Sequence, residues 1–173
     1  EGGNLGLTQR ARIEAAAGGI LVNTDAIDNS AGVETSDREV NLKILMGRAI
    51  EAGQFKEGDR ADFIAEQVEE VGRRVLRSNL EQNVLLQAER TEAFNTNVLA
   101  GEFMDYLAET VHLDREVELL PSDAELADRA EAHVPLTGPE LSVLTAYAKI
   151  DLTAALVNSG YADEPDLDLS DVL

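Results

Sequence analysis

The chain has no cysteine, which excludes disulfide bonds, thiolate catalysis and cysteine-ligated zinc sites. It also has no tryptophan, and only 4% of its residues are aromatic, so a core drawn from its 44% of hydrophobic residues must be largely aliphatic. No apolar run approaches the roughly 20 residues that a membrane-spanning helix needs, and no signal peptide is visible. These absences favour an intracellular protein, and we expect a cytoplasmic location.

Positive charge is scarce as well. The 173 residues include 34 acidic and 14 basic ones, for a net charge of −20. Such a surface repels phosphate backbones and anionic lipids, so we expect neither nucleic acid nor a membrane as a partner. His112 and His133 are the only histidines and lie too far apart in sequence to form a ligand motif. We therefore predict surface or helix-end positions for both, and no metal site.

One stretch of small and polar residues, 23–41, stands out between an apolar run and a helical pattern. The run is Ile20-Leu21-Val22, which predicts a strand, followed by a polar loop that contains Gly32. In α/β proteins such a loop lies at the carboxyl edge of a sheet, where ligands bind. Composition alone favours an ordinary surface loop over a binding loop.

A helix is predicted to follow this loop. Ser36 and Glu39 match a capping box, in which Ser36 is the first residue and Glu39 reaches back to its amide. The next apolar positions share one face of the helix, which we expect to be buried: Val40, Ile44, Leu45 and Ala49. This helix is predicted to stop near Gly53.

Most of the remaining chain is also predicted to be helical. Each predicted helix has a cap or stop signal, at Thr8 and Gly18-Gly19, at Asp59, at Ser122 with Glu125, at Thr137 with Glu140, and at Gly160. After Asp59 a near-continuous helical run extends to about Thr91, and a further amphipathic helix follows around Leu99, Phe103, Tyr106 and Leu107. No internal repeat is present.

The long helix after Asp59 contains an apolar seam of Ile64, Val68, Val71 and Val75. Gly72 lies inside this helix at a cost of about 1 kcal/mol relative to alanine, and close helix packing would explain it. The seam supports an alternative reading of the chain, as a non-catalytic helical module for oligomerisation or regulation. Such seams are more often plain core.

Four segments resemble the NAD-specific glutamate dehydrogenases of the large bacterial class. They are residues 1–10 (EGGNLGLTQR), residues 23–37 (NTDAIDNSAGVETSD), residues 113–123 (LDREVELLPSD) and residues 136–149 (LTGPELSVLTAYAK). The first two are long and specific, and the four segments are distributed along most of the chain. The resemblance implies a fragment that begins inside a catalytic domain. The chain opens on Glu1 rather than Met, and we expect a cut made upstream.

The resemblance also implies a fold. We predict a mainly α, helical bundle-like domain with a short α/β remnant of a dinucleotide-binding domain at the N-terminus. Residues 1–53 would form the C-terminal end of that catalytic domain, residues 54–160 a helical C-terminal domain, and residues 161–173 an acidic tail. A single strand at residues 20–22 needs partners outside this chain.

Three residues are implied as binding residues. Asn4 and Asn29 match asparagines near the cofactor's nicotinamide end, where an amide can both donate and accept hydrogen bonds. The match departs from smaller glutamate dehydrogenases at Gly3 and at residues 30–31, as it does throughout the large class. Ser36 matches a serine that helps to hold the substrate's side-chain carboxylate. The alternatives are that both asparagines only cap turns and that Ser36 only caps a helix.

The implied parent enzyme oxidatively deaminates L-glutamate to 2-oxoglutarate and ammonia, with NAD as hydride acceptor. Its implied partners are L-glutamate, NAD, the upstream catalytic domain and further copies in a homo-oligomer. Glutamate dehydrogenases take their catalytic lysines and aspartate from an upstream substrate domain, and no glycine-flanked lysine motif occurs here. We assign no catalytic residue to this chain and expect it to be inactive in isolation.

Overall fold

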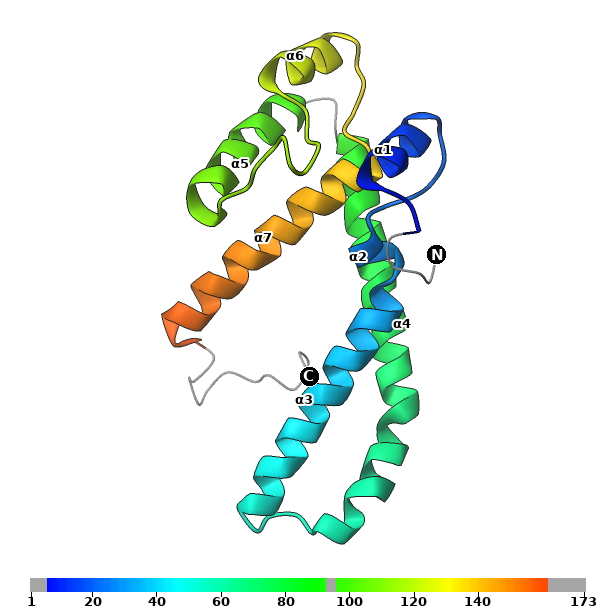
Figure 1. Cartoon of the computed structure of the whole chain (residues 1–173), viewed down its shortest axis with the longest axis vertical. Helices are drawn as coiled ribbons and strands as arrows, with labels where there is room; N and C mark the ends of the chain where they lie inside the picture. Colours follow the sequence, from blue (N-terminus) through cyan, green and yellow to red (C-terminus); the bar gives the residue numbers. More distant parts are fainter. Residues whose placement is uncertain (1–5, 93–95, 162–173) are drawn as a thin grey trace.

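A computed structural model describes residues 6–92 and 96–161, and its regular structure there is entirely helical (Figure 1). The elements are α1 (Gln9–Ala17), α2 (Asp25–Asp28), α3 (Ser30–Glu51), the 3-10 helix η1 (Glu57–Asp59), α4 (Arg60–Glu92), α5 (Thr96–Val111), α6 (Asp123–Glu131) and α7 (Gly138–Ser159). The prediction of a mainly α fold is confirmed. The strand predicted at residues 20–22 is wrong for this chain, because these residues carry no regular structure and no strand occurs in either described range.

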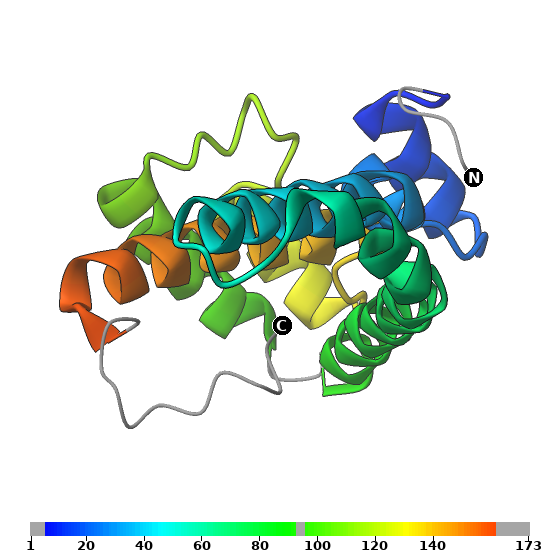
Figure 2. The ribbon, with the colours of Figure 1, turned by 90° about the horizontal axis from the view of Figure 1, so that it is seen from below.

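The helices form a body and a projecting hairpin. α3 and α4 run antiparallel as the hairpin, and the C-terminal half of α4 returns into the body (Figures 1 and 2). There α7 packs against α4, α5 and α1, while α6 packs on α5. The short helix α2 lies at the junction, in contact with both α3 and α4.

The apolar core lies in the body. Met104 and Leu107 of α5 are completely buried at its centre. The other members come from α2, α4, α5, α6, α7 and the connecting segments: Ile27, Leu86, Ala100, Leu113, Leu120, Leu126, Leu136, Leu141, Val143 and Leu144. All are aliphatic, as the scarcity of aromatic residues predicts. Phe55 and Phe63 meet edge to face near the tip of the hairpin, with centroids 5.6 Å apart.

Most predicted helix ends are confirmed, because their signals are local. The Thr8 hydroxyl accepts a hydrogen bond from the Ala11 amide at 3.2 Å. Ser122 and Glu125 form the predicted capping box, in which the Glu125 carboxylate accepts from the Ser122 amide at 2.8 Å. That hydrogen bond lowers the pKa of Glu125. Gly160 ends α7 in the left-handed region, at φ 71°.

The predicted burial of α3 is wrong. Val40, Ile44 and Leu45 are all more than half exposed, whereas Met46 is buried at 4%. The reason is tertiary: α4 is the helix that packs along α3, and it covers the side that carries Met46. The apolar residues predicted to face a core therefore face solvent in this chain.

The seam of α4 is partly buried inside the hairpin. Val75 is 3% exposed, and Ile64 and Val71 are half-buried, while Val68 is 66% exposed. Along this part of α4 the neighbouring helix is α3. Packing of α4 against α3 within the chain thus explains why most residues of the seam are apolar.

Gly72 does not serve close helix packing, because a Cβ at this position meets no atom within 4 Å. We expect Gly72→Ala to raise the free energy of unfolding by up to about 1 kcal/mol, through helix propensity alone. Ala65→Gly, at another exposed position of α4, should lower it by a similar amount. Urea titrations followed by circular dichroism would measure both; a loss of stability in Gly72→Ala would show that the glycine is needed.

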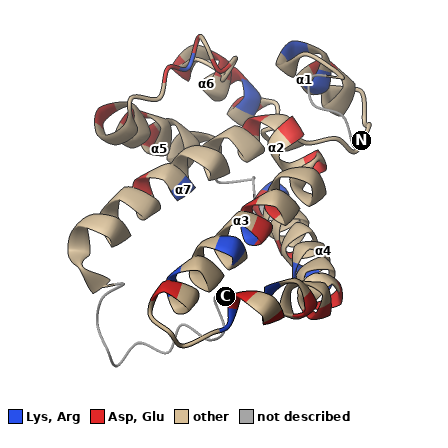
Figure 3. Ribbon diagram, turned by 60° about the horizontal axis from the view of Figure 1, so that its bottom comes forward, with Lys and Arg blue, Asp and Glu red and all other residues tan. Residues whose placement is uncertain are grey.

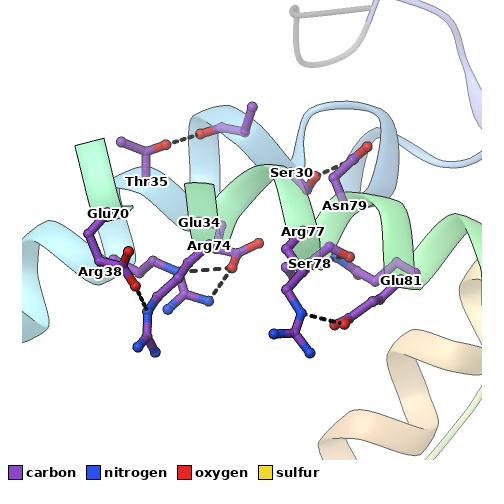
Figure 4. Close-up of polar contacts among 12 residues, drawn as sticks. Ser30, Glu34, Thr35, Arg38, Glu70, Arg74, Arg77, Ser78, Asn79 and Glu81 are labelled. Carbon is purple, nitrogen blue, oxygen red and sulfur yellow. Dashed lines mark hydrogen bonds and ion pairs between the residues drawn. The ribbon is translucent and has the colours of Figure 1, made fainter. Parts of the chain in front are cut away.

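Charged side chains are spread over the hairpin (Figure 3). Many pair within one helix, as Glu34 with Arg38 on α3 and Glu70 with Arg74 on α4 (Figure 4). Hydrogen bonds from Arg73 and Arg74 lower the pKa of Glu70 to about 2, so its carboxylate stays charged until strongly acidic pH. These exposed pairs add little to stability. None of the helices in the described ranges combines the length and the hydropathy that a membrane span requires.

Candidate functional site

The segment predicted to bind ligands is anchored by a buried arginine. Arg12 of α1 is 1% exposed, and its Nη1 donates to the Asn23 carbonyl at 3.0 Å and to Asp28 Oδ2 at 3.1 Å. Its Nη2 forms a hydrogen-bonded ion pair with Asp25. A buried guanidinium is tolerable only when nearby carboxylates compensate its charge, as Asp25 and Asp28 do here. Arg12 therefore ties residues 23–28, which include α2, to α1.

Two asparagines of α4 hold the same segment from the other side. The Asn23 side chain donates to Asn83 Oδ1 at 3.0 Å and to Asp28 Oδ1 at 3.3 Å. Asn79 donates to the Ser30 hydroxyl at 2.6 Å, which fixes the first residue of α3 (Figure 4). Both ends of α2 are thus set by contacts from α1 and α4.

A third contact comes from the N-terminus of α7. At Gly138, a Cβ would lie 2.8 Å from the Val22 carbonyl oxygen and 2.8 Å from Asn23 Oδ1. Only glycine permits this approach of α7 to the segment. Gly138 belongs to the segment 136–149, which resembles the dehydrogenases. Its neighbours in the sequence do not predict the contact, because residues 22–23 lie far away along the chain.

Asn29 lies between α2 and α3, as the N-cap residue of α3, and is half-buried. Its side chain lies over Gly32: a Cβ on Gly32 would come within 2.8 Å of Asn29 Oδ1. Gly32 thus leaves room for the Asn29 amide. The other predicted cofactor residue, Asn4, lies outside the described residues.

Ser36 is not a helix cap. It lies inside α3, is exposed, and donates its hydroxyl hydrogen to the Val33 carbonyl at 2.7 Å. Glu39, the other half of the predicted capping box, forms an ion pair with Lys43 instead. The helix begins six residues earlier because Ser30 is anchored by α4, and the stretch up to Ser36 contains no proline, although Gly32 is a poor helix former.

The structure nevertheless brings two predicted binding residues to one side of α3. Asn29 and Ser36 are separated by about two turns, or roughly 10 Å along the helix axis. Side chains two turns apart project from nearly the same side of a helix. An amide and a hydroxyl therefore flank one stretch of α3, and both can donate and accept hydrogen bonds.

No other chemical site emerges from the residues that the structure describes. His112 and His133 follow the ends of α5 and α6, at positive φ and exposed, as predicted. No three His, Asp or Glu side chains gather there as metal ligands. An open apolar groove of about 420 Å³ lies between α4, α5 and α7, and among the described residues of its lining Glu89 alone is charged. Neither Asn29 nor Ser36 lines this groove.

Comparison with known proteins extends over nearly the whole chain. Residues 1–89 match the family described as bacterial NAD-glutamate dehydrogenase, catalytic domain. The chain is 43% identical over 167 residues to the NAD-specific glutamate dehydrogenase of Halomonas elongata, with 96% of the chain aligned. It is 40% and 43% identical to the enzymes of the same name from Mycobacterium tuberculosis and Pseudomonas aeruginosa, with 95% aligned in each case.

The aligned region is a small part of these relatives. The chain spans 10% of the length of each of the three. The family match includes α1, α2, α3 and most of α4, so it contains Arg12, Asn29 and Ser36 together with their neighbours. The chain therefore belongs to the bacterial NAD-glutamate dehydrogenase family.

Proposed function

We propose that the parent protein oxidatively deaminates L-glutamate to 2-oxoglutarate and ammonia and passes the hydride to NAD. The observation that carries this proposal is the catalytic-domain match over residues 1–89, supported by three relatives that bear the name NAD-specific glutamate dehydrogenase. This chain would contribute the end of the cofactor domain and the helices that brace it. In isolation it would be inactive, because the catalytic lysines and aspartate would come from the rest of the parent.

Within the parent, residues 20–22 would form the strand that the isolated chain lacks. Leu21 is 84% exposed and Ile20 is 62% exposed, which is unusual for consecutive large aliphatic residues. Within the described ranges, neither backbone group of Leu21 makes a hydrogen bond. A neighbouring strand of the parent would satisfy these groups and cover the side chains. This pairing would supply the predicted α/β remnant.

The binding roles come from the resemblance to glutamate dehydrogenases, and the geometry of α3 supports them. Asn29, together with Asn4, would contact the nicotinamide end of NAD, and Ser36 would donate to the side-chain carboxylate of glutamate. The reacting carbon of the substrate must lie beside the nicotinamide ring for hydride transfer. A separation of roughly 10 Å between Asn29 and Ser36 leaves room for both ligands along one side of the helix.

Gly32→Ala tests the cofactor role of Asn29 in the full-length parent. The added methyl group displaces the Asn29 amide, which is the end of a flexible side chain, so folding should be little affected. We expect the KM for NAD to rise roughly ten-fold, as for the loss of one hydrogen bond. Gly47→Ala is the matched control, because a Cβ there meets nothing within 4 Å. Equal KM values for the two variants would refute the role of Asn29.

Ser36→Ala tests the substrate role. Removing a hydrogen bond to a charged group should lower kcat/KM for glutamate by about ten-fold or more in the parent. Thr35→Ala is the control, because the Thr35 hydroxyl also bonds to a carbonyl of its own helix, that of Ala31 (Figure 4). Steady-state NADH formation would be measured for both variants below their unfolding temperatures. Equal losses would show that Ser36 acts only within the helix.

Several predictions about the parent belong to the same proposal. These are its cytoplasmic location, its homo-oligomeric state, and the division of this chain at residues 53 and 161.

A second candidate function, as a non-catalytic helical interaction module, is favoured by Val68, which remains exposed in the seam of α4. Sedimentation of the isolated chain discriminates: a stable oligomer that Val68→Asp dissociates would support the module.

A further inference from the structure

α3 carries a second apolar side, which we call the outward row: Val33, Val40 and Ile44. Their exposed fractions are 48%, 52% and 54%. Helical spacing places them on one side of α3, because they are separated by two turns and one turn. Met46, which is buried, lies on the other side, toward α4. A helix that carries apolar residues on two opposite sides is typically covered by other parts of a protein on both of those sides.

Ser36 lies within the outward row. It follows Val33 by three positions and precedes Val40 by four, which makes it a neighbour of both on the helix surface. Its hydroxyl is exposed and, among the described residues, bonds to its own helix at the Val33 carbonyl. The row therefore combines three large aliphatic side chains with one hydroxyl, and it has a charged neighbour in Asp37, which is exposed and also lies between Val33 and Val40 on the helix surface.

The rest of the dehydrogenase chain is a better occupant of this row than a second copy of the present chain. Every residue of the row lies within residues 1–89, which match the catalytic domain, and the chain spans only a tenth of its relatives. A second copy would bring a further −20 of charge to the same place, and like charges oppose that association. An apolar surface of lower acidity fits the row better.

We infer that the outward row is the surface on which the remainder of the dehydrogenase chain packs through an apolar surface of its own, so that Ser36 lies inside the resulting cleft. This inference rests on the proposed function for the identity of the partner. It assigns a role to side chains that no catalytic step uses. It also explains why apolar residues of α3 whose helical spacing predicts burial are exposed in the isolated chain.

Thiol labelling tests the inference in the full-length parent. The chain has no cysteine, so Ile44→Cys introduces a single thiol into it. We expect maleimide to label this thiol rapidly in the isolated chain and at least about ten-fold more slowly in the parent, because access controls thiol reactivity. Mass spectrometry of the peptide that contains residue 44 separates this thiol from any others in the parent. An equal rate in the two proteins would overturn the inference.

Glu39→Cys is the matched control, since Glu39 is exposed on α3 about a third of a turn around from the row. It should label at similar rates in both proteins, and equal protection of both thiols would show that the cover is not specific to the outward row.

A concentration-dependent dimer of the isolated chain that protects the Ile44→Cys thiol would assign the row to a second copy and overturn the inference. Labelling requires no turnover: protection in a parent that fails to oxidise glutamate would refute the proposed function and leave the docking surface standing.

Discussion

Replacing Arg12 with methionine should destabilise the chain by about 3 kcal/mol or more. The substitution keeps a long side chain in a site that is 1% exposed, but it removes the charge that compensates Asp25 and Asp28. Those carboxylates would remain close together with no cation between them, and the Asn23 carbonyl would lose its donor. A loss of this size is a large fraction of the 5–15 kcal/mol that typically stabilises a domain. Urea denaturation followed by circular dichroism measures it as a lower midpoint.

Arg10→Met is the control for this prediction, because Arg10 lies on the same short helix and is exposed. A surface substitution of this kind should change stability by no more than about 0.5 kcal/mol. Arg12→Lys should fall between the two, since a lysine keeps the charge but cannot donate from a planar fork to several acceptors. If Arg12→Met is no less stable than Arg10→Met, the buried ion pairs do not hold residues 23–28 in place.

Gly138→Ala should destabilise the chain by about 1–3 kcal/mol, the range typical of overpacking. The new methyl carbon would lie 2.8 Å from the Val22 carbonyl oxygen, so backbone must move, and residue 23 is itself held by Arg12 and Asn83. Alanine is otherwise the better helix former, so intrinsic propensity acts in the opposite direction. Thermal unfolding monitored by circular dichroism should show a clearly lower Tm.

Gly72→Ala is the comparison for this prediction, because it separates the effect of overpacking from the effect of helix propensity. Both changes add one methyl group to a helix, but only Gly138 has neighbouring atoms where that group would be placed. We expect opposite signs for the two changes in stability. A stabilised Gly138→Ala would mean that residues 22–23 move aside freely and that α7 does not anchor the candidate site.

The helical character and most helix ends could be predicted from the sequence, because each depends on residues within one turn. Thr8, Ser122 and Gly160 satisfy backbone groups or adopt a conformation that their own chemistry favours. Ser36 shows where this reasoning fails. The same capping pattern occurs there, but contacts from α4 start the helix at Ser30 and leave Ser36 in its interior.

The candidate site was predictable only as a list of residues. The sequence indicates Asn29, Gly32 and Ser36 through resemblance, but it contains no signal for their relative placement. By itself, the sequence determined an aliphatic, acidic, helical chain and the local caps of its helices. The tertiary structure alone decided that Arg12 is buried, that Gly138 touches residues 22–23, and that one apolar side of α3 is left uncovered. Each of these depends on groups far apart in sequence, and periodicity within one helix cannot tell which of two apolar sides a distant helix will cover.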